Sequence, residues 1–399
     1  MRILFVPPNN WAMHPNPMRH HFLFKRLAQS HMCRVYVLNF TGLGHCRAVM
    51  NPSLVFDKNI QLIEKHFLSV RNPALYYFIN SKGTWDALRD ALDELGIDVV
   101  VNSNVLPSAI SSFLSQRMGI CSIYDCMDYY PQSASAYFAK TPVKTLAERA
   151  VASVMRYVIN SSDAVITVSD FHAELVRRIN SRKPIYVVPN GVDLEVFNCG
   201  PIQRPAGKGE VGSQHVNLVY VGSVDEWLDF ESVIEGIHIA KCMGITTHLT
   251  IVGGSHGGFY IDRIMSLVRL HELDRELSLA GFVPHNMVVE YIRSADAVLA
   301  PYKIVTKNQV TPLKILEYLA CGKIVLCTRV TEIQKRFGDF LHFYDGPRDL
   351  ARLLLLLCSD RASMERKPEN AFGTLSEYSW DKLAKRYYDI IRTVVEARS

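Results

Sequence analysis

Two charged residues stand three positions apart in a stretch of the chain that is otherwise apolar. Lys314 and Glu317 interrupt the run Leu313–Ala320, so they share one face of the helix that this run predicts. Thr311 followed by Pro312 is typical of a helix N-terminus, which places Lys314 in the first turn, where unpaired N–H groups favour an anion. A phosphate at Lys314 and a sugar diol at Glu317 would form half of a nucleotide site. The alternative is a simple ion pair on the helix surface.

Two predicted strands in the second half of the chain end in small residues. Gly222 and Ser223 follow one apolar run, and Gly253 and Gly254 follow the next. Small residues let the backbone approach a ligand and aim N–H groups at a phosphate, although they also permit tight turns. These four residues are therefore candidates for binding a phosphorylated ligand.

An acidic and aromatic segment follows a predicted strand in the first half. Asp125, Asp128 and Tyr129 come after Ile120–Tyr124, and ligands of parallel sheets bind beyond the carboxyl ends of strands. We therefore expect both aspartates in a catalytic loop and Tyr129 on its acceptor side. Replacing either aspartate with Asn should lower turnover and barely change the melting temperature. The alternative is a turn that caps the next segment.

The loop after the first strand is polar. It follows Arg2–Val6 and contains Asn9, Asn10 and His14, which we assign to the acceptor side. The loop lacks the glycine spacing of a dinucleotide fingerprint, so NAD and FAD are not indicated.

The predicted strands and helices alternate in both halves, which favours an α/β fold with two doubly wound, Rossmann-like parallel sheets facing a cleft. We expect an N-terminal domain at 1–195, a C-terminal domain at 196–375, and a C-terminal helix at 376–399 that packs back on the first domain. The principal expected strands are Arg2–Val6, Cys33–Asn39, Asp98–Val101, Ile120–Tyr124, Ala164–Val168, Val216–Val221, His248–Val252, Leu277–Phe282 and Ala297–Ala300.

Composition narrows the class of protein. The 399 residues suit two domains, and residues 1–190 carry 20 Lys and Arg against 13 Asp and Glu, whereas the remainder carries 24 against 26. A basic first half suggests an anionic partner, either a membrane surface or a phosphorylated acceptor rather than nucleic acid. Nine scattered cysteines without a CxxC motif indicate a reducing, cytoplasmic location and no metal site. No apolar run is long enough to span a membrane. Any contact of the protein with the inner face of the membrane would therefore be peripheral.

Several motifs in order resemble those of the GT-B glycosyltransferases, in particular the retaining family 4. The matching pieces include Val188–Asp193, Leu279–Pro284, Thr311–Gly322 and Ser379-Trp380. The resemblance implies transfer of a sugar from a nucleoside diphosphate donor to a glycan, lipid-linked or small-molecule hydroxyl, with retention of configuration and no cofactor or metal. It also implies that the domain at 1–195 is the acceptor domain and that the domain at 196–375 is the nucleotide-sugar donor domain. Donor contacts would come from Phe282 and Val283 and from the four strand-end residues, Gly222, Ser223, Gly253 and Gly254.

The chain departs from this family at two places. Gln309 occupies the position of the first of two family glutamates, and Glu317 matches the second, which binds the ribose by resemblance. The basic pair that usually follows the strand before Gly222 is absent, so Lys314 would carry more of the diphosphate charge. These departures keep two alternatives open, a nucleotide-sugar epimerase on the same fold and a non-catalytic sugar-nucleotide binding subunit.

Overall fold

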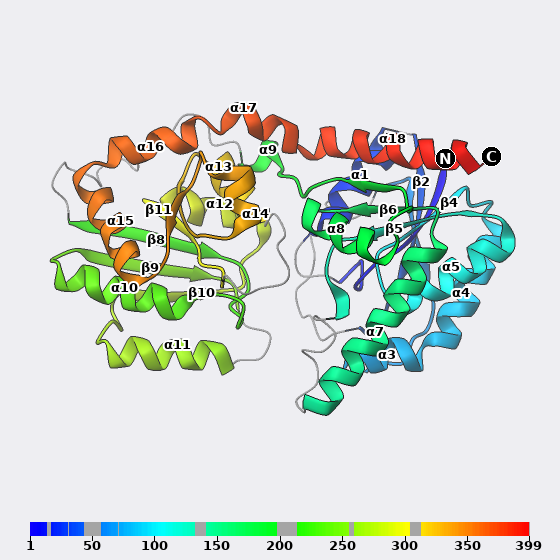
Figure 1. Cartoon of the computed structure of the whole chain (residues 1–399), viewed down its shortest axis with the longest axis horizontal. Coiled ribbons are helices and arrows are strands. Elements are labelled where there is room, and N and C mark those ends of the chain that lie inside the picture. Colours follow the sequence, from blue (N-terminus) through cyan, green and yellow to red (C-terminus); the bar gives the residue numbers. More distant parts are fainter. Residues whose placement is uncertain are drawn as a thin grey trace. The chain divides into compact units, whose positions relative to one another are not determined.

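The chain folds into two compact units. A computed structural model describes residues 1–13, 17–30, 32–43, 57–70, 72–131, 141–197, 214–254, 259–303 and 313–398. Unit 1 comprises Met1–Pro189 and Trp380–Ser399, and unit 2 comprises Asn190–Ser379. The expected boundaries were residues 195 and 375, and the last helix belongs to unit 1. Each unit contains one parallel sheet with helices on both faces, and Figure 1 labels most of the helices and many of the strands.

Unit 1 is built on a sheet of seven described strands in the order β3-β2-β1-β4-β5-β6-β7. The strands are β1 (Arg2–Val6), β2 (Arg34–Asn39), β3 (Ile60–Glu64), β4 (Val99–Asn102), β5 (Cys121–Cys126), β6 (Ala164–Thr167) and β7 (Ile185–Val187). The helices are α1 (Arg19–Gln29), α3 (Pro73–Ile79), α4 (Ser81–Glu94), α5 (Leu106–Met118), α7 (Thr141–Ser161), α8 (Asp170–Ile179) and α18 (Trp380–Arg398). Helix α18 packs on α1 and β5, whereas α5 packs on α4 and α7 (Figure 1).

Unit 2 is built on a sheet of six described strands in the order β10-β9-β8-β11-β12-β13. The strands are β8 (His215–Val221), β9 (Thr246–Val252), β10 (Leu277–Gly281), β11 (Ala297–Ala300), β12 (Ile324–Thr328) and β13 (His342–Tyr344). The helices are α9 (Leu194–Phe197), α10 (Phe230–Cys242), α11 (Phe259–Leu270), α12 (His285–Ser294), α13 (Leu313–Ala320), α14 (Thr331–Phe337), α15 (Pro347–Ser359), α16 (Arg361–Glu369) and α17 (Phe372–Leu375), with a 3₁₀ turn, η1 (Ser376–Tyr378).

Central strands of both sheets are buried on both faces, which explains why they read as continuous apolar runs rather than alternating ones. Every residue of β4, β6, β11 and β12 is buried. The two-domain α/β fold expected from the sequence is confirmed. Among the described helices, none combines the length and the apolar composition needed to cross a bilayer.

One expected element was placed wrongly, and the error changes the role of Asp125. The strand predicted as Ile120–Tyr124 extends through Cys126, because Asp125 pairs with Ile166 and Cys126 with Thr167 in the parallel ladder. Asp125 therefore belongs to the buried strand β5 and not to a loop beyond it. Strand β3 and helix α3 were not expected from the sequence.

Candidate functional site

The carboxyl ends of β8 and β9 bring two glycines of unit 2 together. Gly222 and Gly253 have φ angles of +134° and +132°, which side chains other than glycine rarely adopt. The Gly222 N–H donates to the Val252 carbonyl at 2.8 Å, and a Cβ on Gly253 would overlap the Gly222 carbonyl. A Cβ on Gly254 would lie 2.7 Å from the Phe282 ring. These strand ends therefore present backbone rather than side chains.

Lys314 projects from the first turn of α13 to the same strand end. Its Nζ donates to the Tyr220 hydroxyl at 2.7 Å, and this hydroxyl donates to the Ser223 carbonyl at 2.6 Å. A Cβ on Gly222 would lie 2.6 Å from Nζ, so glycine at this position leaves room for the ammonium group. The ammonium group also lies 4.3 Å from the centre of the Tyr220 ring and 5.6 Å from that of Tyr302.

Glu317 lies one turn after Lys314 on the same helix. Within the described chain, no ion pair joins the two side chains, and no hydrogen bond engages the Glu317 carboxylate. Burial raises the pKa of Glu317 to about 7, with Lys314 opposing the rise. Burial likewise lowers the pKa of Lys314 to about 7, opposed by Glu317 and Asp225. The two groups therefore lie in surroundings that disfavour charge, and each would gain from a polar ligand.

The remaining donor-side candidates differ in their surroundings. The Phe282 side chain is 63% exposed, and Val283 is half-buried against the core of unit 2. Ser223 contributes its carbonyl to the Tyr220 contact. Gln309 lies outside the described residues, and so does Thr311, whose side-chain oxygen we expect to cap α13.

Sequence reasoning missed the two tyrosines that surround the Lys314 ammonium group. Tyr220 is fully buried in β8, where it reads as one more apolar strand residue, and Tyr302 follows β11. Only the aromatic character of both residues in otherwise aliphatic strand ends could have indicated a cation site.

Because Tyr220 accepts a hydrogen bond from the Lys314 ammonium group, Tyr220→Phe should lower the pKa of Lys314 further. A bound diphosphate requires the charged lysine, so the affinity ratio of nucleoside diphosphate to nucleoside should fall as pH rises through about 7. In Tyr220→Phe the same fall should begin at lower pH. Calorimetry of UDP and uridine, or of GDP and guanosine, from pH 5.5 to 9 measures this affinity ratio. Titration of Glu317 would change both affinities alike, because both ligands contain the ribose, and so would leave the ratio unchanged. Identical profiles for both proteins would contradict the role of the hydroxyl.

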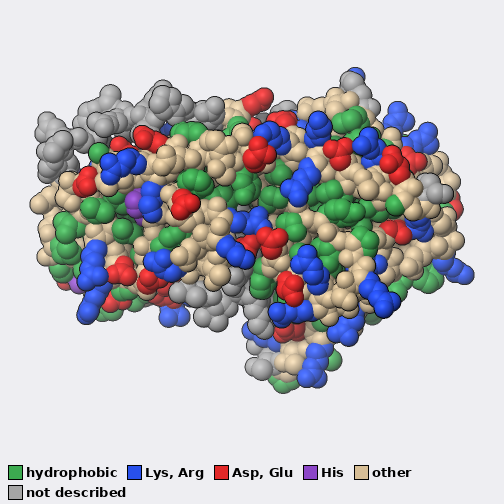
Figure 2. Space-filling view, turned by 45° about the horizontal axis from the view of Figure 1, so that its top comes forward, with side chains coloured by type: hydrophobic (Ala, Val, Ile, Leu, Met, Phe, Trp, Pro, Cys, Tyr) green, Lys and Arg blue, Asp and Glu red, His purple; other side chains and the backbone are tan. Residues whose placement is uncertain are grey.

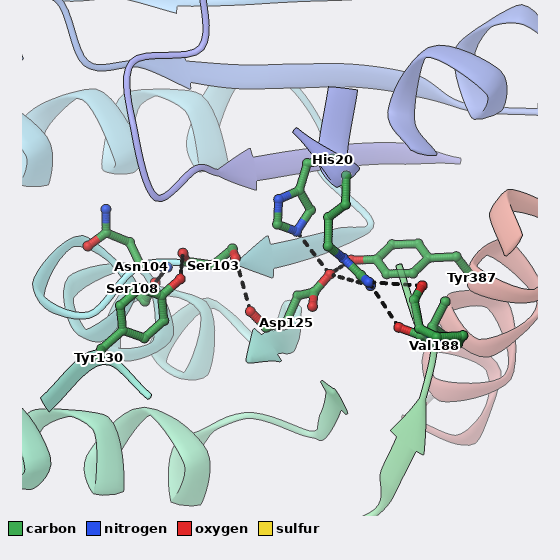
Figure 3. A network of polar contacts seen from close by, with 10 residues as sticks. His20, Ser103, Asn104, Ser108, Asp125, Tyr130, Val188 and Tyr387 are labelled. Atoms are coloured by element: carbon green, nitrogen blue, oxygen red, sulfur yellow. Dashed lines mark hydrogen bonds and ion pairs between the residues drawn. The ribbon is translucent and has the colours of Figure 1, made fainter. Parts of the chain in front are cut away.

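Asp125 is the centre of a buried ion cluster in unit 1 (Figure 3). Its Oδ2 accepts hydrogen bonds from Arg19 Nη2 at 3.3 Å, His20 Nε2 at 2.9 Å and the Tyr387 hydroxyl at 2.8 Å. Arg19 Nη1 also donates to the carbonyls of Val188 and Pro189, at 2.9 and 3.2 Å. Helices α1 and α18 and the residues directly after β7 therefore meet at the Arg19–Asp125 pair.

The surroundings of Asp125 keep it ionised. Burial by itself would raise its pKa, but Arg19, His20 and Tyr387 together lower it to about 2. Burial lowers the pKa of His20, so its neutral ring donates Nε2–H to the carboxylate. The Asp125 side chain is fully buried and the Arg19 side chain is 1% exposed. The prediction that Asp125 lies in a loop is therefore wrong, whereas its catalytic role stays a prediction. The buried cluster leads us to expect a loss of stability on replacement, where the sequence led us to expect almost none.

The neighbouring polar candidates lie along the same carboxyl edge of the unit 1 sheet. Asp128 accepts a hydrogen bond from the Tyr129 N–H at 2.8 Å, and both side chains are half-buried. Asn10 is buried and accepts from the Met13 N–H, whereas Asn9 is half-buried and contacts the Met18 sulfur. His14 lies outside the described residues.

Backbone contacts join the ends of three strands at this edge. The Tyr130 hydroxyl donates to the Ser103 carbonyl at 2.7 Å, and the Ser103 hydroxyl donates to the Asp125 carbonyl at 3.0 Å (Figure 3). Asn104 Nδ2 donates to the Pro7 carbonyl at 3.0 Å. The first residues beyond β1, β4 and β5 are therefore fixed to one another.

Comparison with solved structures gives the same fold. The chain is similar to a sucrose-phosphate synthase from Thermosynechococcus elongatus, at 15% identity and a TM-score of 0.77, with 99% of each chain covered. It is also similar to HepE of Anabaena solved with UDP, at 13% identity and a TM-score of 0.68, with 98% of this chain and 100% of that chain covered. HepE has also been solved with UDP-glucose.

A curated relative matches part of the chain. TuaH of Bacillus subtilis (strain 168), a glycosyltransferase named for teichuronic acid biosynthesis, is 26% identical over 233 residues. The match covers 57% of this chain and 56% of the relative, so this chain spans about half the length of that protein.

Family models match both units. The model described as Glycosyltransferase Family 4 matches residues 25–196, and the model described as Glycosyl transferases group 1 matches residues 215–360. The resemblance drawn from the sequence motifs is confirmed, and neither the epimerase nor the non-catalytic alternative is favoured. The chain belongs to the glycosyltransferases of family 4, group 1, with the GT-B fold.

Proposed function

We propose that this glycosyltransferase moves a sugar from a nucleoside diphosphate to a hydroxyl acceptor with retention of anomeric configuration. The observation that supports the proposal most is the position of Lys314, whose ammonium group lies against the Gly222 turn at the strand ends of unit 2. Ligands of open parallel sheets bind at this edge. Unit 2 would hold the donor and unit 1 the acceptor.

The diphosphate would be held by backbone and by one cation. N–H groups beyond β8 and β9, the N-terminus of α13 and Lys314 would face the phosphates, and Glu317 would accept hydrogen bonds from the ribose. During transfer the bond between the anomeric carbon and the diphosphate oxygen breaks, and the bond to the acceptor oxygen forms. The acceptor proton passes to the departing diphosphate. Lys314 would stabilise the charge that develops on the diphosphate. Its ammonium group would do so effectively because charges interact more strongly where little water is present.

The acceptor proposal draws on the relatives and on charge. TuaH is named for teichuronic acid biosynthesis, and HepE was solved with UDP-glucose, so a glycan or lipid-linked acceptor and a UDP-sugar donor are the first pair to test. Unit 1 carries a net charge of +9 and unit 2 a net charge of −4. We therefore place the protein in the cytoplasm, with peripheral contact between unit 1 and the anionic inner face of a membrane.

Donor binding should not require a divalent metal, because Lys314 and backbone N–H groups supply the positive charge proposed for the phosphates. Calorimetry with UDP and GDP, in the presence and absence of a chelator, should give the same dissociation constant within twofold. Transfer of radiolabelled sugar from the corresponding donor should likewise continue in chelator. Loss of binding in chelator would show that a metal completes the site, and absence of binding by any nucleoside diphosphate would contradict the proposed function.

A further inference from the structure

A hollow in unit 1 lies beside the edge strand β7. Its volume is about 350 Å³, at the lower end of the range for small-molecule sites. The lining comes from α18 and from Tyr186 of β7, and comprises Tyr186, Lys382, Lys385, Arg386, Asp389, Ile390 and Thr393. All of these residues belong to unit 1, so the hollow is complete within one compact unit.

Helix periodicity explains why cations gather at this hollow. Lys382, Lys385 and Arg386 lie at positions i, i+3 and i+4 of α18, so they share one stripe of the helix surface. The opposite stripe of α18 is buried against α1 and the sheet. This buried stripe includes Tyr387, which belongs to the Asp125 cluster. The helix therefore cannot rotate to disperse the three cations. Figure 2 turns the upper side of Figure 1 forward and shows Lys and Arg side chains recurring over unit 1.

The positive charge of the hollow is only partly compensated. Asp389 is the one acidic residue in the lining, and it forms an ion pair with Arg392, with 3.6 Å between Nη2 and Oδ1. Among the described residues, no carboxylate lies within 4 Å of the Lys385 or Arg386 cationic groups, and both side chains are exposed. Like charges three and four positions apart destabilise a helix unless an anion lies between them.

An aromatic side chain completes the hollow. Tyr186 pairs with Ile166, which pairs with Asp125, so these three residues lie at the same level of the parallel sheet. Residues at one level point to the same face, which places Tyr186 on the α18 side with Asp125. In the described chain no hydrogen bond engages the Tyr186 hydroxyl. A ring that can pack against a sugar, next to unneutralised Lys and Arg, is typical of a site for an anionic saccharide.

We propose that the hollow between α18 and β7 binds the anionic group, carboxylate or phosphate, of a glycan acceptor. The role of this saccharide as the acceptor rests on the proposed function, whereas its binding at the hollow does not. Arg386 would bind the anion through its planar fork, Lys385 would add a second charge, and Tyr186 would contact the sugar ring. The site would bind acceptors by charge and leave the reacting hydroxyl group of the sugar to other parts of the protein.

Calorimetry with three saccharides tests the site and separates its possible sources of charge. The probes are trigalacturonate, which carries carboxylates, glucose 1-phosphate, which carries a phosphate, and maltotriose, a neutral control. At least one anionic probe should bind about 10-fold or more tightly than maltotriose, and its affinity should fall with added salt. Lys385→Gln/Arg386→Gln should weaken that probe about 10-fold or more and leave maltotriose unchanged. Anionic vesicles serve as a third source of charge, and binding that is confined to them would overturn the proposal.

A matched pair of substitutions controls for general electrostatics. Lys58→Gln/Lys82→Gln removes the same charge from exposed positions of unit 1 and should leave the affinity for the anionic probe unchanged. UDP affinity should be unchanged in Lys385→Gln/Arg386→Gln, whereas Lys314→Ala should weaken UDP and spare the anionic saccharide. Equal losses in the two double variants, or equal affinity for maltotriose and both anionic probes, would overturn this inference. Loss of UDP binding alone would concern the donor site.

Discussion

Asp125→Asn should destabilise unit 1 by about 3–5 kcal/mol, because it leaves the buried Arg19 guanidinium without its counter-charge. The substitution keeps the shape of the side chain, so the loss reports charge and hydrogen bonding rather than a cavity. The change in the free energy of unfolding is measured by urea titration, with the fluorescence of unit 1 as the signal. A change below about 1 kcal/mol would contradict the structural role of the cluster.

The pH dependence of this loss has a definite sign. The pKa of Asp125 in the folded protein is about 2, below its ordinary value of 3.8. The carboxylate therefore stabilises the fold above pH 4, and this contribution disappears as pH falls toward 2. The difference between wild type and Asp125→Asn should accordingly shrink as pH falls from 4 to 2.

Two variants provide controls for Asp125→Asn. Asp381→Asn breaks an ion pair with Arg26 in the same unit, but Asp381 is 75% exposed, so the loss should stay below about 1 kcal/mol. Arg19→Met/Asp125→Leu removes both charges and should recover much of the stability lost in Asp125→Asn. Failure of the double variant to recover would show that Arg19 acts chiefly through its contacts with Val188 and Pro189.

Lys314→Ala should weaken nucleoside diphosphate by roughly 1.5–3 kcal/mol, about 10-fold to 150-fold, and plain nucleoside hardly at all. The difference arises because a charge-assisted contact to phosphate is lost, whereas base and ribose contacts remain. Glu317→Gln should weaken both ligands by similar factors, since both contain the ribose. A 3′-deoxynucleotide should lose most of its sensitivity to Glu317→Gln.

Removing the charge of Lys314 should stabilise the protein, in contrast to the loss of stability expected for Asp125→Asn. Because burial lowers the pKa of Lys314 from 10.5 to about 7, the folded protein disfavours the charged lysine below pH 10.5, and fully so below about 7. Lys314→Met, which keeps the volume and removes the charge, should therefore raise the melting temperature at pH 6 more than at pH 10. A lower melting temperature at both values would indicate that the Tyr220 contact stabilises the fold.

Apolar periodicity was enough to predict most strands and the two α/β units. Strand β1 was predicted with its observed bounds, and β8 began one residue earlier than expected, because both strands are apolar runs between polar residues. Strand β5 was truncated at Tyr124 because an aspartate in a buried strand contradicts the apolar pattern. An aspartate can occupy this buried strand because three buried side chains donate hydrogen bonds to its carboxylate.

Long-range partners could not be read from the sequence. Asp125 meets Arg19 across 106 positions and Tyr387 across 262, and Lys314 meets Tyr220 across 94. Spacing within a helix or strand predicts only local neighbours, so Lys314 and Glu317 could be placed on one face while their surroundings could not. The hydroxyl that holds the Lys314 ammonium group thus became visible only in the folded sheet.

The most direct measurement of the donor site is the affinity ratio of nucleoside diphosphate to nucleoside in three proteins. Wild type, Lys314→Ala and Glu317→Gln are titrated with UDP and uridine, or with GDP and guanosine, by calorimetry at pH 6.5. We expect the ratio to fall about 10-fold or more in Lys314→Ala and to stay within twofold of wild type in Glu317→Gln. An unchanged ratio in Lys314→Ala, or equal falls in both variants, would contradict the assignment of Lys314 to the diphosphate.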